Sequence, residues 1–392
     1  MTEFPLANRL NGVTYAIRDI VAEAKKVEKN NGPVLYLNIG DPLVFDFKTP
    51  DHLLNAVKKA MENQKNGYAP SEGSIEAREA ISRDWKKKTG LDVESEDVII
   101  TSGVSEGISF FFSAFTNPGE SILLPRPGYP IYDGLQKLFG LKECYYCLDP
   151  FEEWRPDFED IRKKINEDTK ALVIINPNNP TGAIYSKTDL KKLIDLAGEF
   201  DLVIVADEIY DKLVFDKHIA LASIANDIPV LTFNGLSKNW LAPGWRTAWG
   251  IFHDPNGRIE KIKEGMFQLS RLRLSGVFPM QFAVKAALEG PMDYLKPVIE
   301  KLKRRGDLIS KRLNEIEGVK VSVPKGAFYV FPKIPALDDK KFSLDLLRKE
   351  RVLGVHGSGF GMPGYIRLVF LMEDKILEEA MDIFSRFVRS RR

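Results

Sequence analysis

The sequence of 392 residues has few features that would indicate binding of nucleic acid or of a metal. Lysine plus arginine (56) and aspartate plus glutamate (55) nearly cancel, and the net charge is +1. A chain so balanced has no overall field to attract nucleic acid or an anionic membrane surface. The few histidines are scattered through the chain without metal-ligand spacing. They are His52, His218, His253 and His356.

Cysteine is almost absent, with only Cys144 and Cys147 in the segment Glu-Cys-Tyr-Tyr-Cys-Leu. A C-x-x-C pair can indicate a redox or zinc site. No second pair is present, and the segment has the pattern of a strand, in which residues three apart point to opposite faces. We therefore interpret the two cysteines as ordinary thiols.

Long apolar runs are missing as well. No stretch approaches the roughly 18 apolar residues that span a bilayer, and the N-terminus lacks the apolar segment of a signal peptide. Hydrophobic residues (44%) and charged residues (28%) are present in the proportions of a globular protein. The length favours about two or three domains. The sequence thus predicts a cytoplasmic protein.

From residue 98 onward, short apolar runs alternate with polar turns and helical segments. Strands that are apolar on both faces and separated by helices indicate a mostly parallel sheet covered on both sides. At least six such strands can be counted, beginning near residues 98, 121, 171, 202, 230 and 247. In these sheets ligands bind beyond the carboxyl ends of the strands. Polar clusters follow the predicted strands at those ends.

The pattern of the sequence changes near residue 290, where an α+β pattern replaces the alternation of short strands and helices. We predict a large domain over residues 47–290 and a small C-terminal domain over residues 291–392. Residues 1–46 are expected to form an arm, a helix and a short strand associated with the small domain and the active site.

One polar cluster, Gly235-Leu-Ser-Lys238, is followed after eight residues by Arg246 in Pro-Gly-Trp-Arg. A lysine amine can form a Schiff base with an aldehyde cofactor. The hydroxyl of Ser237 and the guanidinium of Arg246 could hold the phosphate of that cofactor. The alternative is a surface lysine in a polar loop, since lysine is mostly exposed.

A second cluster, Ser102-Gly-Val-Ser-Glu, lies at a strand-to-helix turn. Free N–H groups and the helix dipole make such a turn a phosphate site, although serine and glutamate here also fit plain helix capping. Gly40 ends another short strand, where it either serves the turn or lets a small substrate approach the backbone.

Other strand ends carry single polar groups whose roles stay open. Asp207 follows buried apolar residues, so its carboxylate requires a partner such as a protonated pyridine nitrogen, or it caps a helix. Asn179 and Tyr210 could reach a phenolate oxygen of the same ring, and Tyr129 could stack on that ring. Asn179 could also be an ordinary turn residue, and Tyr129 an ordinary aromatic of a loop. Arg367 could clamp an α-carboxylate or simply pack its stem.

Taken together in chain order, these motifs resemble the class I/II aminotransferases, which are pyridoxal 5′-phosphate (PLP) enzymes of fold type I. The resemblance covers essentially the whole chain and is closest to the microbial alanine (glutamate–pyruvate) aminotransferases. The motifs are Tyr68, Ser-Gly-Val-Ser, Pro-Gly-Tyr129-Pro, Asn-Pro-x-Asn-Pro-Thr-Gly, Ala-Asp-Glu-Ile-Tyr, Gly-Leu-Ser-Lys, Pro-Gly-Trp-Arg and Tyr-Ile-Arg-Leu. The resemblance implies a mostly parallel seven-stranded sheet with helices on both faces, plus a smaller α+β domain.

The resemblance also implies a role for each residue. Lys238 would bind PLP and shuttle a proton. Asp207 would pair with the pyridinium, Tyr210 and Asn179 would hold the phenolate oxygen, and Tyr129 would stack on the ring. The phosphate would be held by Ser237, Arg246 and the N–H groups of Val104 and Ser105, with Tyr68 reaching the neighbouring subunit's phosphate in a homodimer. Gly40, Asn179 and Arg367 would bind the substrate's α-carboxylate.

The implied reaction is a ping-pong transfer of the amino group from L-alanine to 2-oxoglutarate, giving pyruvate and L-glutamate. The distal carboxylate of glutamate needs a cation, for which Arg18, Arg271 and Arg273 are candidates, and Tyr15 and Tyr129 could narrow the pocket. The phosphate turn reads Gly-Val-Ser where many relatives have a second small residue or threonine. Backbone donors do not depend on that side chain, so we expect the same binding mode.

Rival functions remain. The same motifs serve aspartate and aromatic aminotransferases, cystathionine β-lyase-type C–S lyases and a cyclopropane-forming synthase. The fold also occurs in transcription regulators, but these carry an N-terminal winged helix and a basic patch that are not evident here. A dinucleotide-binding dehydrogenase would need G-x-G-x-x-G after a strand, and no early strand has it.

Overall fold

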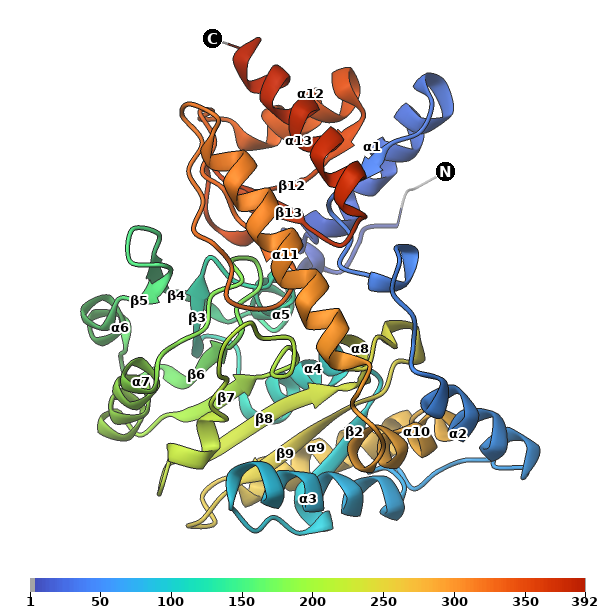
Figure 1. Cartoon of the computed structure of the whole chain (residues 1–392). Coiled ribbons are helices and arrows are strands. Elements are labelled where there is room, and N and C mark those ends of the chain that lie inside the picture. The colour runs from blue at the N-terminus through green and yellow to red at the C-terminus, as the bar shows by residue number, and fades with distance from the viewer. Residues whose placement is uncertain (1–3, 392) are drawn as a thin grey trace.

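The computed structural model describes residues 4–391 and is built around an eight-stranded sheet of order β2-β9-β8-β7-β6-β3-β4-β5 (Figure 1). The strands β9 and β5 run antiparallel to their neighbours, and the others run in one direction. The strands are β2 (Val98–Thr101), β3 (Ser121–Arg126), β4 (Lys142–Asp149), β5 (Arg155–Pro156), β6 (Thr169–Ile175), β7 (Val203–Asp207), β8 (Val230–Gly235) and β9 (Ala248–His253).

The predicted fold class is confirmed, with one strand more than the seven expected. The additional strand, β5, has two residues and pairs with the end of β4. Two residues are too few to show an apolar pattern, which is why the sequence did not predict this strand. In β4 itself, Cys144 is half-buried and Cys147 is exposed, and both thiols are free.

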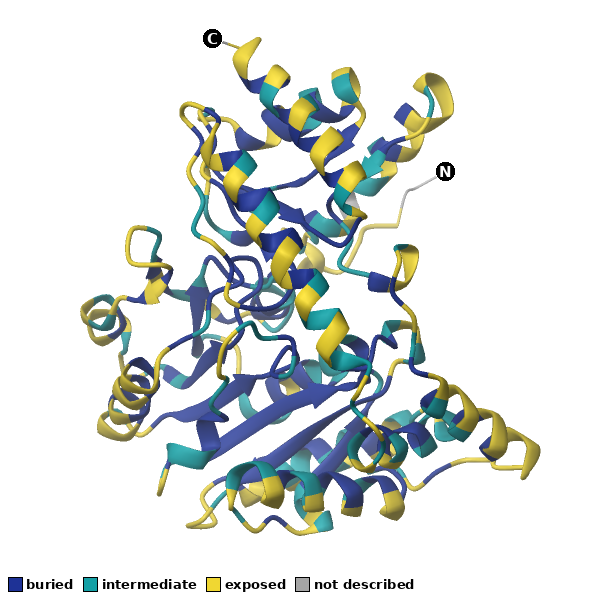
Figure 2. Cartoon of the chain, viewed as in Figure 1, coloured by how far each residue is buried: buried dark blue, intermediate teal, exposed yellow. Residues whose placement is uncertain are grey.

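Helices cover both faces of the sheet because neighbouring residues of a strand point to opposite sides. In β2, for example, Ile99 packs with α4 (Val104–Phe115), α5 (Pro130–Leu138) and α9 (Glu260–Arg273). Its neighbour Ile100 belongs to the apolar core on the other face. That core includes residues of α2 (Asp51–Glu62), α3 (Ile75–Thr89), α6 (Phe158–Lys164), α7 (Lys187–Glu199) and α10 (Phe278–Glu289). Figure 2 shows the strands buried and the outer helix surfaces exposed.

The C-terminal part has a separate apolar core beneath α11 (Leu295–Asn314), α12 (Asp339–Glu350) and α13 (Asp374–Arg389). These helices pack on a small antiparallel sheet of order β10-β13-β12. Its strands are β10 (Tyr329–Val330), β12 (Val355–His356) and β13 (Ile366–Val369). The sheet thereby positions Arg367, which lies on its central strand.

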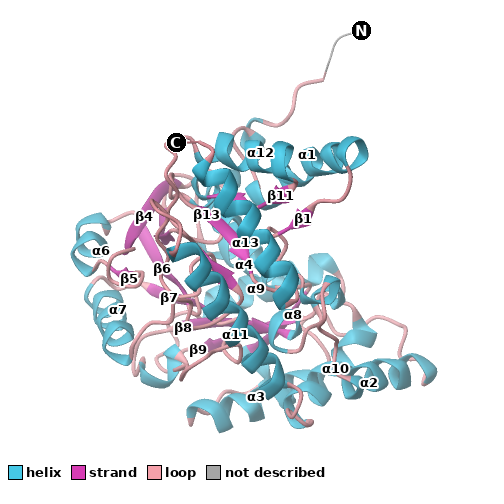
Figure 3. Cartoon of the chain, turned by 45° about the horizontal axis from the view of Figure 1, so that its top comes forward, coloured by secondary structure: helices cyan, strands magenta, loops and turns pink. Residues whose placement is uncertain are grey.

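The N-terminal segment joins this C-terminal part. The helix α1 (Ala16–Asn31) lies beside α12 (Figure 3), and β1 (Leu35–Tyr36) pairs in parallel with β11 (Val352–Leu353). Further along, the Asp46 carboxylate accepts hydrogen bonds from Arg305 Nη1 and Nη2 at 2.8 and 2.9 Å. Residues 37–46 are thus held at both ends. The division into domains at residues 46 and 290 stays a prediction.

No helix within residues 4–391 combines the length and the apolar character that crossing a membrane requires. The expected cytoplasmic location stays a prediction.

Candidate active site

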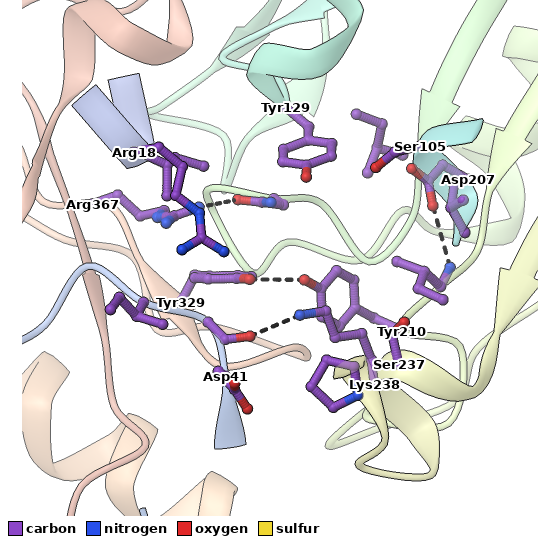
Figure 4. A pocket seen from close by; sticks show the side chains of 18 of the residues that line it. Arg18, Asp41, Ser105, Tyr129, Asp207, Tyr210, Ser237, Lys238, Tyr329 and Arg367 are labelled. Atoms are coloured by element: carbon purple, nitrogen blue, oxygen red, sulfur yellow. Dashed lines mark hydrogen bonds between the residues drawn. The ribbon is translucent and has the colours of Figure 1, made fainter. Parts of the chain in front are cut away.

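A cavity of about 540 Å³ opens at the carboxyl ends of β6, β7 and β8, between the large sheet and the C-terminal part. Figure 4 shows its side chains converging from the N-terminal segment, the sheet and the small domain. The cavity is lined by Tyr15, Ile17, Arg18, Ile39, Gly40, Asp41, Val104, Ser105, Tyr129, Ile175, Asn179, Asp207, Ile209, Tyr210, Ser237, Lys238, Pro243, Gly244, Arg246, Tyr329 and Arg367. Every site residue predicted from the sequence lies here except Tyr68 and the two arginines of α9.

Lys238 lies in the middle of the cavity, on the single helical turn α8 (Leu236–Asn239) that follows β8. Its Nζ donates a hydrogen bond to the carbonyl oxygen of Gly40 at 2.7 Å. Burial lowers the pKa of Lys238 to about 8, against the opposing effect of the Asp41 charge. A depressed pKa provides neutral, nucleophilic amine near neutral pH. Lys238 therefore has the environment of a reactive lysine.

One end of the cavity is suited to an anion. The helix α4 begins at Val104, after Gly103 with φ of 83°, and Val104 and Ser105 of its first turn line the cavity. The first N–H groups of a helix have no partner within the helix and can bind an anion. Arg246 approaches the same turn: a Cβ built on Gly103 would lie 2.0 Å from Arg246 Nη2. Arg246 Nη2 also donates to the carbonyl of Ser102 at 3.3 Å. Only glycine leaves room for the guanidinium here, and Ser237 lines the same end.

A carboxylate lies deep in the cavity at the end of β7. Asp207 is 3% exposed and accepts hydrogen bonds from Ile209 N at 3.4 Å and from Tyr132 Oη at 3.2 Å. Burial raises the pKa of Asp207 to about 6. Within the described residues these contacts supply hydrogen bonds but no ion pair. A cationic group of a ligand would relieve the cost of burying this charge.

The opposite wall holds Arg367, which is 1% exposed. Its Nη1 donates to Asn179 Oδ1 at 2.9 Å and its Nη2 to the carbonyl of Asn38 at 2.8 Å. Its Nε has no hydrogen-bond partner among the described residues. A buried guanidinium without a carboxylate partner suits an anionic ligand group. Because Arg367 occupies Oδ1 of Asn179, the amide NH₂ of that residue is left as a donor.

Two tyrosine pairs complete the cavity. Tyr15 and Tyr129 share a hydrogen bond between their hydroxyls at 2.8 Å, and their rings meet edge to face at 6.3 Å. Tyr210 and Tyr329 share a second hydroxyl–hydroxyl bond, also at 2.8 Å. Arg18 of α1 is exposed, and Figure 4 shows it on the Arg367 side of the cavity, away from Asp207.

Three predicted residues lie outside this cavity. Tyr68 is 80% exposed on a loop that contacts residues 274 and 275. Arg271 pairs with Glu72 at 3.3 Å, and Arg273 forms a short ion pair with Glu106. Both arginines already pair with glutamates, and neither lines the cavity of its own chain. Arg18 remains as the candidate.

Three residues of the site were not predicted, because their signal in the sequence is weak. Tyr132 stands three residues after Tyr129, and this helical spacing places its hydroxyl near Asp207. Asp41 directly follows Gly40 and lines the cavity, where its carboxylate also accepts Leu43 N at 3.0 Å. Tyr329 belongs to the apolar run Ala-Phe-Tyr-Val-Phe, which reads as a core strand.

The site lies at the edge of a mostly parallel sheet, with a lysine at the end of one strand. On one side a helix N-terminus and an arginine can bind an anion, and on the other side lies a buried arginine. This combination defines the class of fold type I aminotransferases. The comparisons with known proteins agree. The chain belongs to the family of class I and II aminotransferases, whose model matches residues 32–384.

Individual relatives match over almost their full length. Glutamate-pyruvate aminotransferase AlaA of Haemophilus influenzae is 39% identical, over 99% of both chains. An alanine aminotransferase of Mycobacterium tuberculosis is 38% identical, over 99% of this chain and 94% of that protein. The solved structure of an alanine aminotransferase from Pyrococcus furiosus matches with a TM-score of 0.96 and 46% identity, covering 98% of this chain and all of that one.

Proposed function

We propose that the protein is an alanine aminotransferase that uses PLP to transfer the amino group of L-alanine to 2-oxoglutarate, giving pyruvate and L-glutamate in a reversible ping-pong reaction. The observation that carries this proposal is the position of Lys238. It lies between an anion-binding helix N-terminus and Arg367, whose buried Nε has no partner among the described residues.

The residues present fit the cofactor. The first turn of α4, Arg246 and Ser237 would hold its phosphate, where glycine at position 103 leaves room for the arginine. Asp207, buried without an ion pair in the described chain, would hold the pyridinium nitrogen. With its aldehyde carbon bound to Lys238, PLP would supply the carbon that takes up the amino group and a protonated ring that withdraws electrons from the substrate.

Lys238 would also act as the base in the proton transfer. With a pKa of about 8, roughly a tenth of the free amine is neutral at pH 7, against well under a thousandth for an ordinary lysine, so Nζ can accept the proton from the substrate's Cα. Gly40 has no side chain, and its carbonyl holds Nζ at 2.7 Å. The N-terminal segment therefore helps to orient the amine.

The substrate's α-carboxylate would bind Arg367, with the NH₂ of Asn179 and the backbone at Gly40 as further contacts. Tyr210 and Asn179 would donate hydrogen bonds to the cofactor's phenolate oxygen, and Tyr129 would stack on its ring. Tyr15 and Tyr129, which also line the cavity, would narrow the space beyond Cα. Such a pocket favours a methyl side chain, as in alanine.

Glutamate and 2-oxoglutarate carry a second carboxylate, and we propose Arg18 as its partner. Arg18 is the exposed arginine on the α1 side of the cavity, three residues after Tyr15 in the sequence. Because its side chain is exposed to solvent, Arg18 can stay hydrated and unpaired with the substrate when alanine is bound. That difference would allow one pocket to accept both a methyl group and a carboxylate.

We further propose that the active unit is a homodimer. Tyr68 cannot serve its own cavity, yet it lies on a loop beside exposed apolar residues that a second copy would cover. These are Leu272, Leu274 and Val277, exposed by 84%, 51% and 43%. Hydrogen bonds tie the two loops together, from Ala69 N to Ser275 Oγ at 3.0 Å and from Ser71 Oγ to the carbonyl of Leu274 at 2.7 Å. Tyr68 would reach the phosphate of the partner.

The test is a donor scan in the absence of any oxo acid. PLP-loaded protein is mixed separately with alanine, glutamate, aspartate, phenylalanine and cystathionine, while the cofactor absorbance, pyruvate and ammonia are followed. We expect alanine and glutamate to convert the cofactor to its amine form without releasing ammonia. Pyruvate and ammonia from cystathionine, with no response to alanine, would instead identify a C–S lyase.

A further inference from the structure

Tyr329 lines the cavity and contacts three of its functional groups. Its hydroxyl lies 2.8 Å from that of Tyr210, and its ring centre lies 4.6 Å from the guanidinium carbon of Arg367. A Cβ built on Gly40 would lie 2.4 Å from Tyr329 Oη, so this hydroxyl is packed against the backbone that holds Lys238. Figure 4 shows Tyr329 between Arg367 and Tyr210.

The hydroxyl pair has a direction. Each phenol carries one proton, so one of the two hydroxyls must donate to the other. Both side chains are buried, and burial raises the pKa of Tyr210 and of Tyr329, which keeps both hydroxyls protonated at neutral pH. If Tyr210 donates into the cavity, Tyr329 must be the donor within the pair. A hydroxyl that accepts one hydrogen bond is polarised and donates the next more strongly.

The ring of Tyr329 has a second function. Arg367 makes hydrogen bonds through both Nη atoms, but the plane of its guanidinium is supported by aromatic rings, those of Tyr329 at 4.6 Å and Phe360 at 4.8 Å. A cation over an aromatic face is stabilised by the ring quadrupole. The ring thus holds Arg367 toward the cavity independently of the Tyr329 hydroxyl.

We propose that Tyr329 is a positioning residue that couples the two halves of the site. Its hydroxyl donates to Tyr210 and directs the Tyr210 proton into the cavity, while its ring supports the carboxylate-binding Arg367. This inference rests on the proposed function, in which Tyr210 donates to the cofactor and Arg367 holds the substrate.

Two substitutions separate the hydroxyl from the ring. Tyr329→Phe removes only the hydroxyl, whereas Tyr329→Leu removes the ring as well. Tyr146→Phe is the matched control, because the Tyr146 hydroxyl is also buried and donates to the carbonyl of Val173 at 3.0 Å, outside the cavity. For each protein we would measure PLP affinity, the pH midpoint of the visible band of bound PLP, kcat and KM, and the unfolding temperature of the cofactor-free protein.

For Tyr329→Phe we expect kcat to fall about threefold to tenfold, the effect of one neutral hydrogen bond. The pH midpoint should rise by about half to one pH unit, because a weaker Tyr210 donor stabilises the phenolate less. The KM for alanine and for 2-oxoglutarate should stay within about twofold. Tyr329→Leu should show the same changes and also raise both KM values about threefold to thirtyfold, since Arg367 loses a supporting ring.

Tyr146→Phe should lower the unfolding temperature and leave the midpoint, kcat and KM unchanged. If Tyr329→Phe behaved like this control, its hydroxyl would be merely structural and the proposal would be overturned. Equal KM values in Tyr329→Phe and Tyr329→Leu would overturn the role of the ring. Failure of the unmodified protein to bind PLP would refute the proposed function itself, and the inference would fall with it.

Discussion

Replacement of Arg18 by alanine should separate the two substrate pairs. Arg18 is an exposed residue of the cavity, and the structure leaves it as the arginine that can meet a second carboxylate. An exposed ion pair contributes about 0–1 kcal/mol, and a charge-assisted hydrogen bond is about twice as strong as a neutral one. We therefore expect a loss of about 1–2 kcal/mol for glutamate and 2-oxoglutarate.

That loss corresponds to roughly a fivefold to thirtyfold fall in kcat/KM for those two substrates. Alanine and pyruvate lack the second carboxylate, so their kcat/KM should stay within about twofold. Steady-state assays in both directions supply the four values. Lys26→Ala is the matched control because Lys26 is an exposed cation on the same helix, paired with Glu23 at 3.5 Å.

The decisive quantity is the ratio of kcat/KM for glutamate to that for alanine. It should fall in Arg18→Ala, recover partly in Arg18→Lys and stay unchanged in Lys26→Ala. An equal fall for all four substrates would show that Arg18 supports the fold of the cavity rather than its selectivity. No fall at all would remove Arg18 as the partner of the distal carboxylate.

Further predictions concern the other groups of the site. Arg367→Lys keeps the charge but loses the planar fork, so kcat/KM should fall about tenfold to a hundredfold for every amino and oxo acid alike; loss for glutamate alone would contradict this assignment. Gly103→Ala should displace Arg246, because its Cβ would lie 2.0 Å from Nη2, and weaken PLP binding about tenfold or more in an absorbance titration. Gly90→Ala, with φ of 79° but no atom within 4 Å, should cost stability without weakening PLP binding. In the cofactor-free protein, burial raises the pKa of Asp207 from 3.8 to about 6. Between these two pH values the carboxyl is protonated in the folded protein and ionised in the unfolded chain. Asp207 therefore destabilises the folded protein increasingly as the pH rises from about 4 to about 6, and by a constant amount above that. The free energy of unfolding of Asp207→Asn should exceed that of the unmodified protein by an amount that grows over this range to roughly 3 kcal/mol. An advantage that does not change with pH would refute the buried, unpaired carboxylate.

Much of this architecture follows from the order of short apolar runs and polar turns. Strands such as Val203–Asp207 are apolar on both faces, and a buried parallel strand needs that pattern. Polar residues such as Asp207, Asn179 and Lys238 stand where those strands end, and in a parallel sheet all such ends lie along one edge. The convergence of these residues in one cavity could therefore be expected before their contacts were known.

Other features depend on tertiary packing that local sequence does not carry. The pattern around Tyr329 is that of a core strand, and only the approach of Gly40 and Arg367 from distant parts of the chain makes it part of the cavity. Arg271 and Arg273 illustrate the reverse. Their charge suggests a ligand, but their helix directs them to Glu72 and Glu106 instead.

The attachment site of the cofactor tests the central claim most directly. PLP-loaded protein would be reduced with borohydride, digested, and its modified peptide located by mass spectrometry. We expect one phosphopyridoxyl group per chain, on Lys238, and none in a parallel sample of Lys238→Ala. A modification at another lysine, or none in the unmodified protein, would contradict the assignment of this cavity as the site of amino transfer.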